Sequence, residues 1–516
     1  MKTFCEKVYL TIAMPTEEDT VGDQQRLRQA LAARGYEPVT FPVHLLRRLY
    51  PMCRDWGYRL TATLVYREDG WILTDVEPGD ATGRLYGLAM DYGSTTMVME
   101  LVDVSSGAVI ARAGEMNGQI RYGTDILSRI TYTMEDPAHR AELHQATAQT
   151  FNHLLDALTE ESGIDARHCP VLIVSGNTTM IHFLLELDAW TVFASPFSPV
   201  TTDPGWFWGR ELGLDFPGIV YIIPAASNYV GGDIVSGLLN LNLRESDGIQ
   251  LFFDIGTNGE LVIGNQDWIL GGAGAAGPAL EGYISRFGIR AQPGAIDTVT
   301  IQGGELCFTT IGNRKPVGIC GSGIIDLLAQ MRLAGWMDIS GKLNPAASAN
   351  IVYLEEEDQY VAVYATKEQS GLDEALYFSQ TDIHQYLDTK AAAYTMVECL
   401  LEAAGCTIAD IDRLWLSGAF SAHANLESAI TIGVFPDLPR EKFHCIPNAS
   451  VDGARCLLLN RERMGDIRRF AGEMYCVQFA SIPDFLVRMQ AAKFIPHTDM
   501  TRYPTIAQRL NGANLT

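Results

Sequence analysis

Basic residues are in short supply in this chain of 516 residues. Its 38 lysines and arginines stand against 62 aspartates and glutamates, which gives a formal net charge of −24. Nucleic acids and anionic membranes bind to basic surfaces, so the shortage argues against both as partners. It does not exclude a nucleotide, because a phosphate site can be built from backbone N–H groups alone.

Clusters of cysteine are lacking as well. The ten cysteines are scattered, no two of them have C-x-x-C spacing, and their order fits no zinc or ferredoxin pattern. We therefore expect free thiols in a reducing compartment and no iron–sulfur cluster in this chain.

Two further absences concern location and nucleotide binding. The N-terminal apolar run is short and has no cleavage site, and the longest uncharged stretch, "FPGIVYIIPAASNYVGG", carries two prolines. We expect no signal peptide, no membrane span and a cytoplasmic location. The chain has neither G-x-x-x-x-G-K-S/T nor G-x-G-x-x-G followed by an acidic residue, so a P-loop or Rossmann site is unsupported.

The residues that are present make an ordinary globular composition, with 47% hydrophobic and 19% charged residues. Strands alternate with helices beyond residue 86, which indicates α/β layering. We expect a small N-terminal α+β domain over residues 1–85, with a hairpin at Asp69 and Gly70. A first lobe is expected over residues 86–225 and a second over residues 226–516, with the C-terminal segment returning toward the first lobe.

Two similar hairpins stand far apart in the chain. They are "LAMDYGSTTMVMELVD", which begins at Leu88, and "LFFDIGTNGELVIG", which begins at Leu251. In each, an apolar strand ends in an aspartate, a glycine-containing turn follows, and two more short strands come next. This repeat predicts a duplicated α/β domain with two lobes.

The chemistry of these turns suits phosphate and magnesium. A turn lined by glycine, serine and threonine exposes backbone N–H groups to phosphate oxygens. A carboxylate at the strand end can hold Mg²⁺ through water, because the ion keeps most of its hydration shell. One such turn also occurs in plain hairpins, but a pair in the same three-strand frame predicts a clamp around magnesium and phosphates.

A third glycine turn lies in "WLSGAFSAHANLESAITIG", which begins at Trp415. A strand ends there in Gly418-Ala419-Phe420, and a helix follows. Small residues at this turn leave room for an adenine or a ribose; the alternative is tight packing of strand against helix. Residues 271–282, "GGAGAAGPALEG", have so few side chains that a ligand or another backbone must come close.

The two hairpins and the late glycine turn, in this order, resemble the ASKHA superfamily of ATPases and kinases. More narrowly, the chain resembles reductive activators of corrinoid proteins. The resemblance covers about residues 58–485 and includes "NGQIRYGTDILSRI", "SGNTTMIHFLLEL", "NYVGGDIVSGLL" and "PNASVDGA". It implies an α/β fold with a duplicated actin-like, RNase H-like ATPase domain, whose two lobes surround a nucleotide cleft.

The chain departs from that family in two ways. Typical members begin with a 2Fe–2S ferredoxin domain, and nothing here follows its cysteine pattern. In the first hairpin, Tyr92 replaces the usual aliphatic residue and Ser94 replaces a threonine, which keeps the hydroxyl group. We therefore expect that electrons come from a separate protein.

The resemblance implies a set of site residues. Asp91, Asp254 and Asp233 would be the catalytic carboxylates and would bind Mg²⁺ through water, with Glu260 a weaker candidate. The residues expected to bind the nucleotide are Gly93, Ser94, Thr95 and Thr96 in the first hairpin, Gly256, Thr257, Asn258 and Gly259 in the second, and Gly418, Ala419 and Phe420 around adenosine.

The resemblance also implies a function. ATP and Mg²⁺ would be the cofactors, and hydrolysis would remodel or reductively reactivate a corrinoid protein or methyltransferase subunit; the relatives suggest a homodimer. Two alternatives stay open. A small-molecule kinase of the same fold would need a carboxylate base beside a polyhydroxyl pocket, and the sequence offers no convincing one. A scaffold that binds nucleotide without hydrolysis is disfavoured by Asp91 and Asp254.

Overall fold

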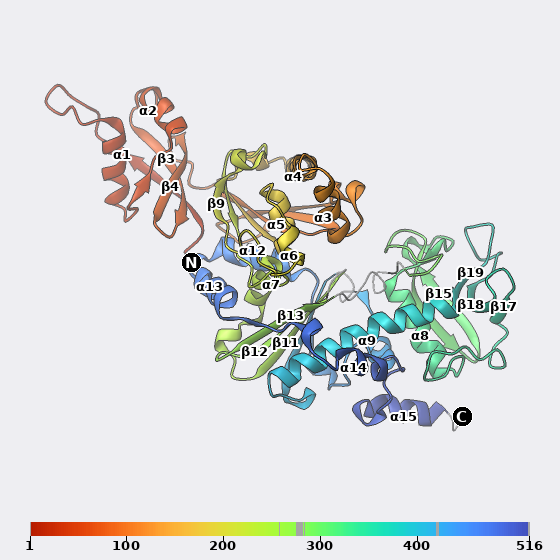
Figure 1. Ribbon diagram of the computed structural model, residues 1–516. Helices are drawn as coiled ribbons and strands as arrows, with labels where there is room; N and C mark the ends of the chain where they lie inside the picture. The colour runs from red at the N-terminus through yellow and green to blue at the C-terminus, as the bar shows by residue number, and fades with distance from the viewer. Residues whose placement is uncertain (1, 257–258, 275–281, 283, 419–422, 514–516) are drawn as a thin grey trace. The chain divides into compact units, whose positions relative to one another are not determined.

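The computed structural model describes residues 2–256, 259–274, 282, 284–418 and 423–513. The chain forms two compact units (Figure 1), Met1–Asn242 with Ala449–Glu473 and Leu243–Asn448 with Met474–Thr516. Each unit is therefore built from two separate segments of the chain. The domain boundaries expected at residues 85 and 225 do not coincide with the limits of these units, and they stay a prediction.

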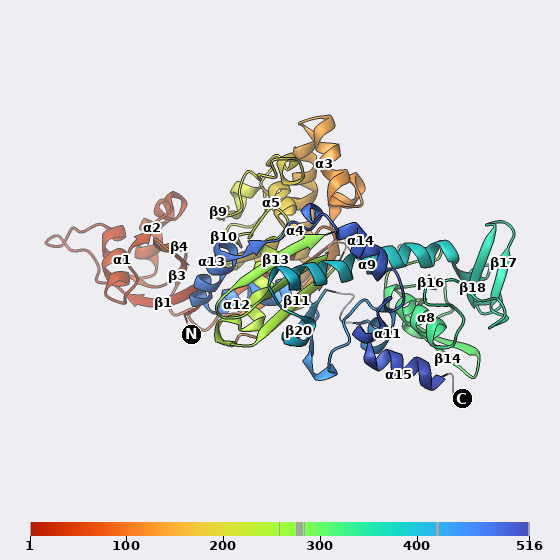
Figure 2. The ribbon, with the colours of Figure 1, turned by 60° about the horizontal axis from the view of Figure 1, so that its bottom comes forward.

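The first unit begins with a small α+β domain. β1 (Cys5–Thr11), β2 (Val39–Thr40), β3 (Arg59–Arg67) and β4 (Gly70–Pro78) form a sheet in the order β1-β3-β4-β2. Helices α1 (Asp23–Ala32) and α2 (Val43–Asp55) share one hydrophobic core with this sheet (Figure 2). The β3–β4 hairpin turns where Asp69 and Gly70 predict it, with Arg67 opposite Gly70. The sequence analysis did not predict α2, which contains Pro51.

The main sheet of the first unit has the strand order β7-β6-β5-β8-β10-β9. β5, β6 and β7 are an antiparallel meander, and β8 and β10 run parallel to β5. The strands are β5 (Tyr86–Tyr92), β6 (Thr96–Asp103), β7 (Val109–Met116), β8 (Val171–Gly176), β9 (Gly205–Trp208) and β10 (Ile219–Ile222).

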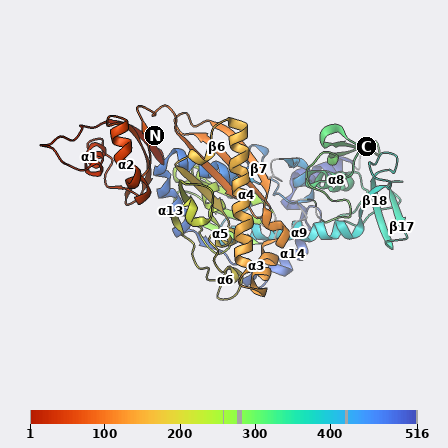
Figure 3. The ribbon, with the colours of Figure 1, turned by 90° about the horizontal axis from the view of Figure 1, so that it is seen from above.

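The remaining helices of this unit are α3 (Ile126–Glu135), α4 (His139–Ser162), α5 (Thr178–Leu184), α6 (Trp190–Phe193), α7 (Gly232–Gly237), α12 (Ala449–Leu459) and α13 (Met464–Glu473). Among them, α4, α7 and α12 pack directly against that sheet. Figure 3 shows α4 lying along β6 and β7. Its inward face is an apolar stripe, with Leu143, Phe151, Leu154 and Leu158 buried. It ends at Gly163, whose φ of 70° favours glycine.

The main sheet of the second unit has the order β21-β20-β11-β12-β13-β22. Its strands are β11 (Ile249–Ile255), β12 (Gly259–Gly264), β13 (Ile269–Gly274), β20 (Ile411–Ser417), β21 (Phe443–Ile446) and β22 (Tyr475–Cys476). Two smaller sheets, β15-β14-β16 and β17-β18-β19, follow in the same unit. Their strands are β14 (Ala295–Gln302), β15 (Glu305–Thr310), β16 (Gly318–Ile319), β17 (Ile351–Leu354), β18 (Gln359–Ala365) and β19 (Leu376–Ser379).

The helices of the second unit are α8 (Gly321–Leu333), α9 (Gln380–Ala403), α11 (Leu426–Ile432), α14 (Phe485–Ala492) and α15 (Pro504–Ala513). α9 lies along β12 and β13 (Figure 2). The apolar spacing typical of a helix begins in the sequence only at Lys390, in "KAAAYTMVECLLEAAG". The helix α9 begins ten residues earlier, because Ser379 and Asp382 form a capping box at its start. Among the described helices, none is both long and apolar enough to cross a membrane.

The two main sheets repeat one arrangement. β5 and β11 each pair with an antiparallel hairpin partner on one side and a parallel strand on the other. The register repeats as well, because Asp91 lies opposite Ser175 of β8 and Asp254 lies opposite Ser417 of β20. The duplicated α/β fold predicted from the two hairpins is therefore confirmed.

Candidate functional site

The first hairpin, residues 93–96, joins β5 to β6. Gly93 leaves no space for a side chain, since a Cβ there would lie 2.4 Å from the carbonyl oxygen of Thr96. Asp91 is half-buried at the end of β5. Tyr92 is fully buried and its hydroxyl lies 2.8 Å from Thr147 Oγ1, so this departure from the family pattern places a ring in the core behind the turn.

Side chains behind the first hairpin hold its carbonyl groups. The Asn117 side-chain amide donates to the Gly93 carbonyl oxygen at 2.9 Å, and the Asn117 backbone N–H donates to that of Thr95 at 2.9 Å. Arg129 Nη2 donates to the Ser94 carbonyl oxygen between them at 2.7 Å. Three successive carbonyl groups are thus held by Asn117 and Arg129.

This arrangement determines where the N–H groups of the hairpin point. In a planar trans peptide, the N–H points opposite to the carbonyl of the preceding residue. The N–H groups of residues 94–96 therefore face away from Asn117 and Arg129. A row of such donors is an anion-binding concavity, and the hydroxyl groups of the same residues add further donors.

The Asp91 carboxylate is held by serine hydroxyl groups. Ser450 Oγ, on α12, donates to Asp91 Oδ1 at 2.9 Å and also lies 2.9 Å from Ser175 Oγ. Ser175 Oγ lies 2.7 Å from Ser236 Oγ on α7. All three serines are buried, so a network of hydroxyl groups links Asp91 to α7.

Asp233 lies in the first turn of α7, at the same edge of the sheet. Its Oδ1 accepts the N–H of Ile234 at 2.9 Å, and Ser236 Oγ donates to its carbonyl oxygen. A Cβ on Gly231 would lie 2.7 Å from Asp233 Oδ1 and 2.4 Å from Asn177 Cα, so the carboxylate lies beside the turn that ends β8. The first unit thus brings Asp91, Asp233 and the first hairpin to the carboxyl edge of its parallel strands.

The second hairpin joins β11 to β12, with Ile255 opposite Gly259. Asp254 lies directly opposite Glu260, and both are half-buried. Two carboxylates side by side repel each other, so this pair favours a bound cation. Gly256 and Gly259 flank the turn; Thr257 and Asn258 lie outside the described residues.

The late glycine turn lies next to the second hairpin. Gly418 has a φ of 93°, and a Cβ there would lie 2.3 Å from the Ile255 carbonyl oxygen and 3.1 Å from Asp254 Oδ1. Glycine is therefore required at this position both for its backbone conformation and for space. The structure brings Gly418 and Asp254 together, while Ala419 and Phe420 lie outside the described residues.

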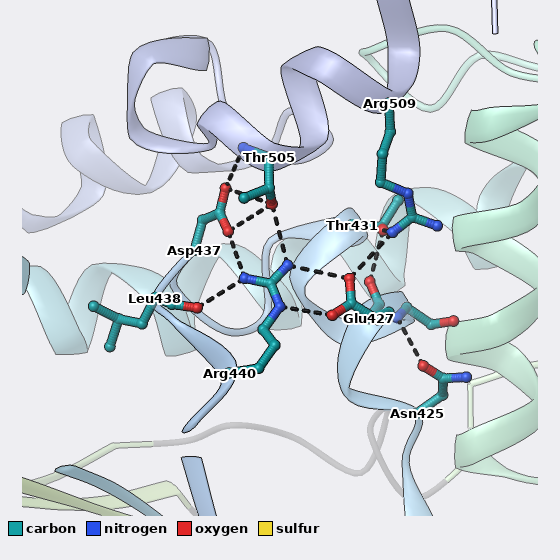
Figure 4. A network of polar contacts seen from close by, with 9 residues as sticks. Asn425, Glu427, Thr431, Asp437, Leu438, Arg440, Thr505 and Arg509 are labelled. Carbon is teal, nitrogen blue, oxygen red and sulfur yellow. Dashed lines mark hydrogen bonds and ion pairs between the residues drawn. The ribbon is translucent and has the colours of Figure 1, made fainter. Parts of the chain in front are cut away.

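A network of polar contacts anchors the helix that follows this turn (Figure 4). The Arg440 guanidinium donates to Glu427 Oε1 at 2.6 Å, to Asp437 Oδ1 at 2.8 Å and to Thr505 Oγ1 at 3.1 Å. Glu427 lies on α11 and Thr505 on α15. The bond from Arg440 lowers the pKa of Glu427, so the carboxylate stays ionised at neutral pH. The network therefore holds α11 against α15.

The carboxylates of these turns fit magnesium better than a metal whose ligands must all come from protein side chains. Within the part of the chain that the structure describes, no three His, Cys, Asp or Glu side chains gather into a metal site. Mg²⁺ keeps several waters and is usually held by one or two carboxylates together with substrate phosphates. Asp91 beside the N–H row and the Asp254–Glu260 pair are carboxylates of that kind.

Sequence reasoning assigned no role to Asn117, Arg129 or Ser450. All three lie in stretches that carry the family resemblance, but their partners are hairpin carbonyls and Asp91, which are distant in the sequence. Their bonds depend on tertiary contacts, so spacing along the chain gives no sign of them.

Three family profiles match the chain in order. A RACo linker region matches residues 1–83, a RACo middle region matches residues 86–246, and the C-terminal domain of RACo, the ASKHA domain, matches residues 248–507. The last match alone covers half of the chain.

Individual relatives agree with these profiles. The solved structure of a reductive activator for corrinoid, iron-sulfur protein is 35% identical, with a TM-score of 0.88 over 98% of this chain and 81% of that chain. Corrinoid activation enzyme RamQ of Eubacterium limosum is 28% identical over 87% of this chain and 79% of its own length. The Co(II) methylated amine-specific corrinoid protein reductase of Methanosarcina barkeri is 22% identical over 75% of this chain and 72% of its own.

Proposed function

Because this chain belongs to the RACo family of corrinoid-protein activators, we propose that it is an ATPase that promotes the reductive reactivation of a corrinoid protein. The client would be a corrinoid subunit of a methyltransferase system. Electrons would come from a separate protein, and the active form would be a homodimer in the cytoplasm.

The observation that best supports nucleotide hydrolysis is the row of N–H groups at residues 94–96, fixed by bonds to the carbonyls behind it. Phosphoryl transfer to water needs little covalent chemistry from a protein, because positioning and charge neutralisation supply most of the catalysis. Asn117 and Arg129 hold this row in place from behind, so it needs little rearrangement during the reaction.

We assign the remaining roles on the same basis. Ser94, Thr95 and Thr96 bind phosphate oxygens from the first unit, and Thr257 and Asn258 do so from the second. Gly418, Ala419 and Phe420 flank adenosine. Asp91, Asp233 and Asp254 would hold magnesium and orient the attacking water, and the metal would supply neutralisation of the phosphate charge.

The first test is ATP hydrolysis by the purified chain with magnesium and no sugar or acid acceptor. Asp254→Asn should lower turnover by at least about tenfold, because it removes one charged group near the metal. The matched control is Asp412→Asn. Asp412 lies on β20 next to Asp254's strand, but it accepts the N–H of Ile249 at the opposite end of that strand.

We expect the control variant to hydrolyse ATP at the rate of the unchanged protein. Wild-type turnover in Asp254→Asn would remove the role that we give this carboxylate. Nucleotide binding without any turnover in the unchanged chain would favour the scaffold alternative instead.

A further inference from the structure

We propose that Arg129 is the positioning residue of the first hairpin, and that its charge makes this hairpin selective for phosphate. Asn117 assists it by holding the neighbouring carbonyl groups. This inference rests on the proposed function, since it concerns how the same nucleotide site recognises its ligand.

The first argument is that Arg129 is a buried cation with neutral partners. It lies on α3 and is 0% exposed. Its guanidinium donates to the carbonyl oxygens of Ser94 and Gly123 and to Gln119 Oε1, at 2.7, 3.0 and 3.3 Å, and it approaches the Met180 sulfur at 3.5 Å. Burial lowers its pKa, yet an arginine side chain stays protonated in proteins.

A second buried arginine of the same unit shows the contrast. Arg26 is 6% exposed and also donates to three carbonyl oxygens, those of Ala13, Asp19 and Val21. It has in addition an ion pair with the Asp19 carboxylate at 2.6 Å. Among the described residues, Arg129 has no ion pair of this kind.

Asp125, the N-cap residue of α3, lies near enough to raise the pKa of Arg129 but forms no ion pair with it. Part of the cost of burying the Arg129 charge is therefore uncompensated and favours a further anion nearby. Such an anion would bind on the far side of the hairpin, because the bond from Arg129 ends on the Ser94 carbonyl and the N–H of Thr95 in the same peptide group points the opposite way. That bond also polarises the peptide group, which makes its N–H a better donor. A phosphate bound there therefore balances the charge of Arg129 across a single peptide.

Arg129→Met tests the inference in the purified full-length chain. Affinities for Mg-ATP and for adenosine are measured by titration calorimetry. We expect ATP to bind at least about tenfold more weakly, as suits the loss of a charge-assisted bond, while adenosine affinity changes by less than about twofold. Arg129→Lys keeps the charge without the forked donors, and should give an intermediate ATP affinity.

Arg26→Met is the matched control. It removes a similarly buried arginine that holds three carbonyls, but it lies in the N-terminal α+β domain. We expect it to lower thermal stability and to leave the ratio of ATP to adenosine affinity unchanged. If the role of Arg129 were purely structural, Arg129→Met would also leave this ratio unchanged, because the affinities for ATP and adenosine would fall equally or not at all.

Unchanged ATP affinity in folded Arg129→Met overturns the inference and leaves the proposed function standing. Failure of the unchanged protein to bind ATP sinks the proposed function itself. If Arg129→Met does not fold, Asn117→Ala serves instead. It removes one neutral donor to the Gly93 carbonyl, so ATP affinity should fall about fivefold with adenosine unaffected, and no change in that ratio contradicts the proposal.

Discussion

Lys390 is a single residue on which the placement of the C-terminal segment depends. It lies on α9, is 0% exposed, and donates from Nζ to the carbonyl oxygens of Ala492 at 2.6 Å, Phe494 at 2.8 Å and Pro496. Burial lowers its pKa from 10.5 to about 7. The three carbonyl acceptors match the three N–H bonds of an ammonium group and favour the protonated side chain, whereas burial favours the neutral one.

The lowered pKa of Lys390 predicts a pH dependence of stability. Between about pH 7 and 10.5 the unfolded chain binds a proton at this residue that the folded chain does not. The contribution of Lys390 to the free energy of unfolding therefore rises with pH across this window and is lost as pH falls toward 7. Urea unfolding at pH 7, 8 and 9 measures the slope.

Lys390→Met is the comparison for that measurement, because methionine fills similar space without a titrating group. The difference in unfolding free energy between the two proteins should change with pH in the stated direction. A difference that stays constant across the three pH values would contradict the assignment.

At the scale of elements, α7 and α12 cross at closest range through Gly453. A Cβ there would lie 2.0 Å from the Ser236 carbonyl oxygen. Gly453→Ala should therefore destabilise the first unit by about 1–3 kcal/mol, the usual cost of overpacking. It should also lower ATP turnover, because the crossing holds Ser450 against Asp91.

Gly465→Ala is the control for that crossing, since Gly465 lies on the neighbouring helix α13 with no heavy atom within 4 Å of its Cβ position. It should leave stability unchanged or raise it slightly, because alanine favours a helix. The measurements are the denaturant midpoints of Gly453→Ala and Gly465→Ala, followed by their ATPase rates. Equal midpoints would show that the crossing tolerates a methyl group.

Elements are also the scale at which the sequence was most informative. Asp91 and Asp254 end buried strands as expected, because an apolar run with a carboxylate and a glycine turn has few other solutions. The start of α9 was missed because a capping box of Ser379 and Asp382 begins the helix before its apolar run. The helix α2 was missed because it contains Pro51, and proline disfavours the interior of a helix. The carbonyl bonds of Asn117 and Arg129 link residues that only the tertiary fold brings together, and no spacing along the chain reveals them.

At the scale of the whole molecule, an activator driven by ATP must bind its client differently in its nucleotide states. A ligand shifts an equilibrium only by its difference in affinity for the two states. We expect at least a fivefold difference in affinity for a corrinoid protein between the ATP-bound and ADP-bound chain, the lower limit of usual coupling energies. Surface-immobilised chain with an ATP analogue or with ADP gives both affinities.

The matched control for this measurement is Asp254→Asn, which should bind the client with little dependence on the nucleotide. Equal affinities in all nucleotide states of the unchanged protein would separate hydrolysis from client binding, and would argue that ATP serves another step.

The segment Ala449–Glu473 completes the first unit, and residues near the N-terminus form hydrogen bonds with it. The Phe4 N–H donates to the Leu458 carbonyl oxygen at 3.0 Å, and Arg461 bonds to the Thr3 carbonyl oxygen and to Glu6. On the ribosome, a nascent chain released before residue 449 would leave both cores open, because the second unit also needs Met474–Thr516. Asp91 would then lack the bond from Ser450, so a prematurely terminated product would have an incomplete candidate site.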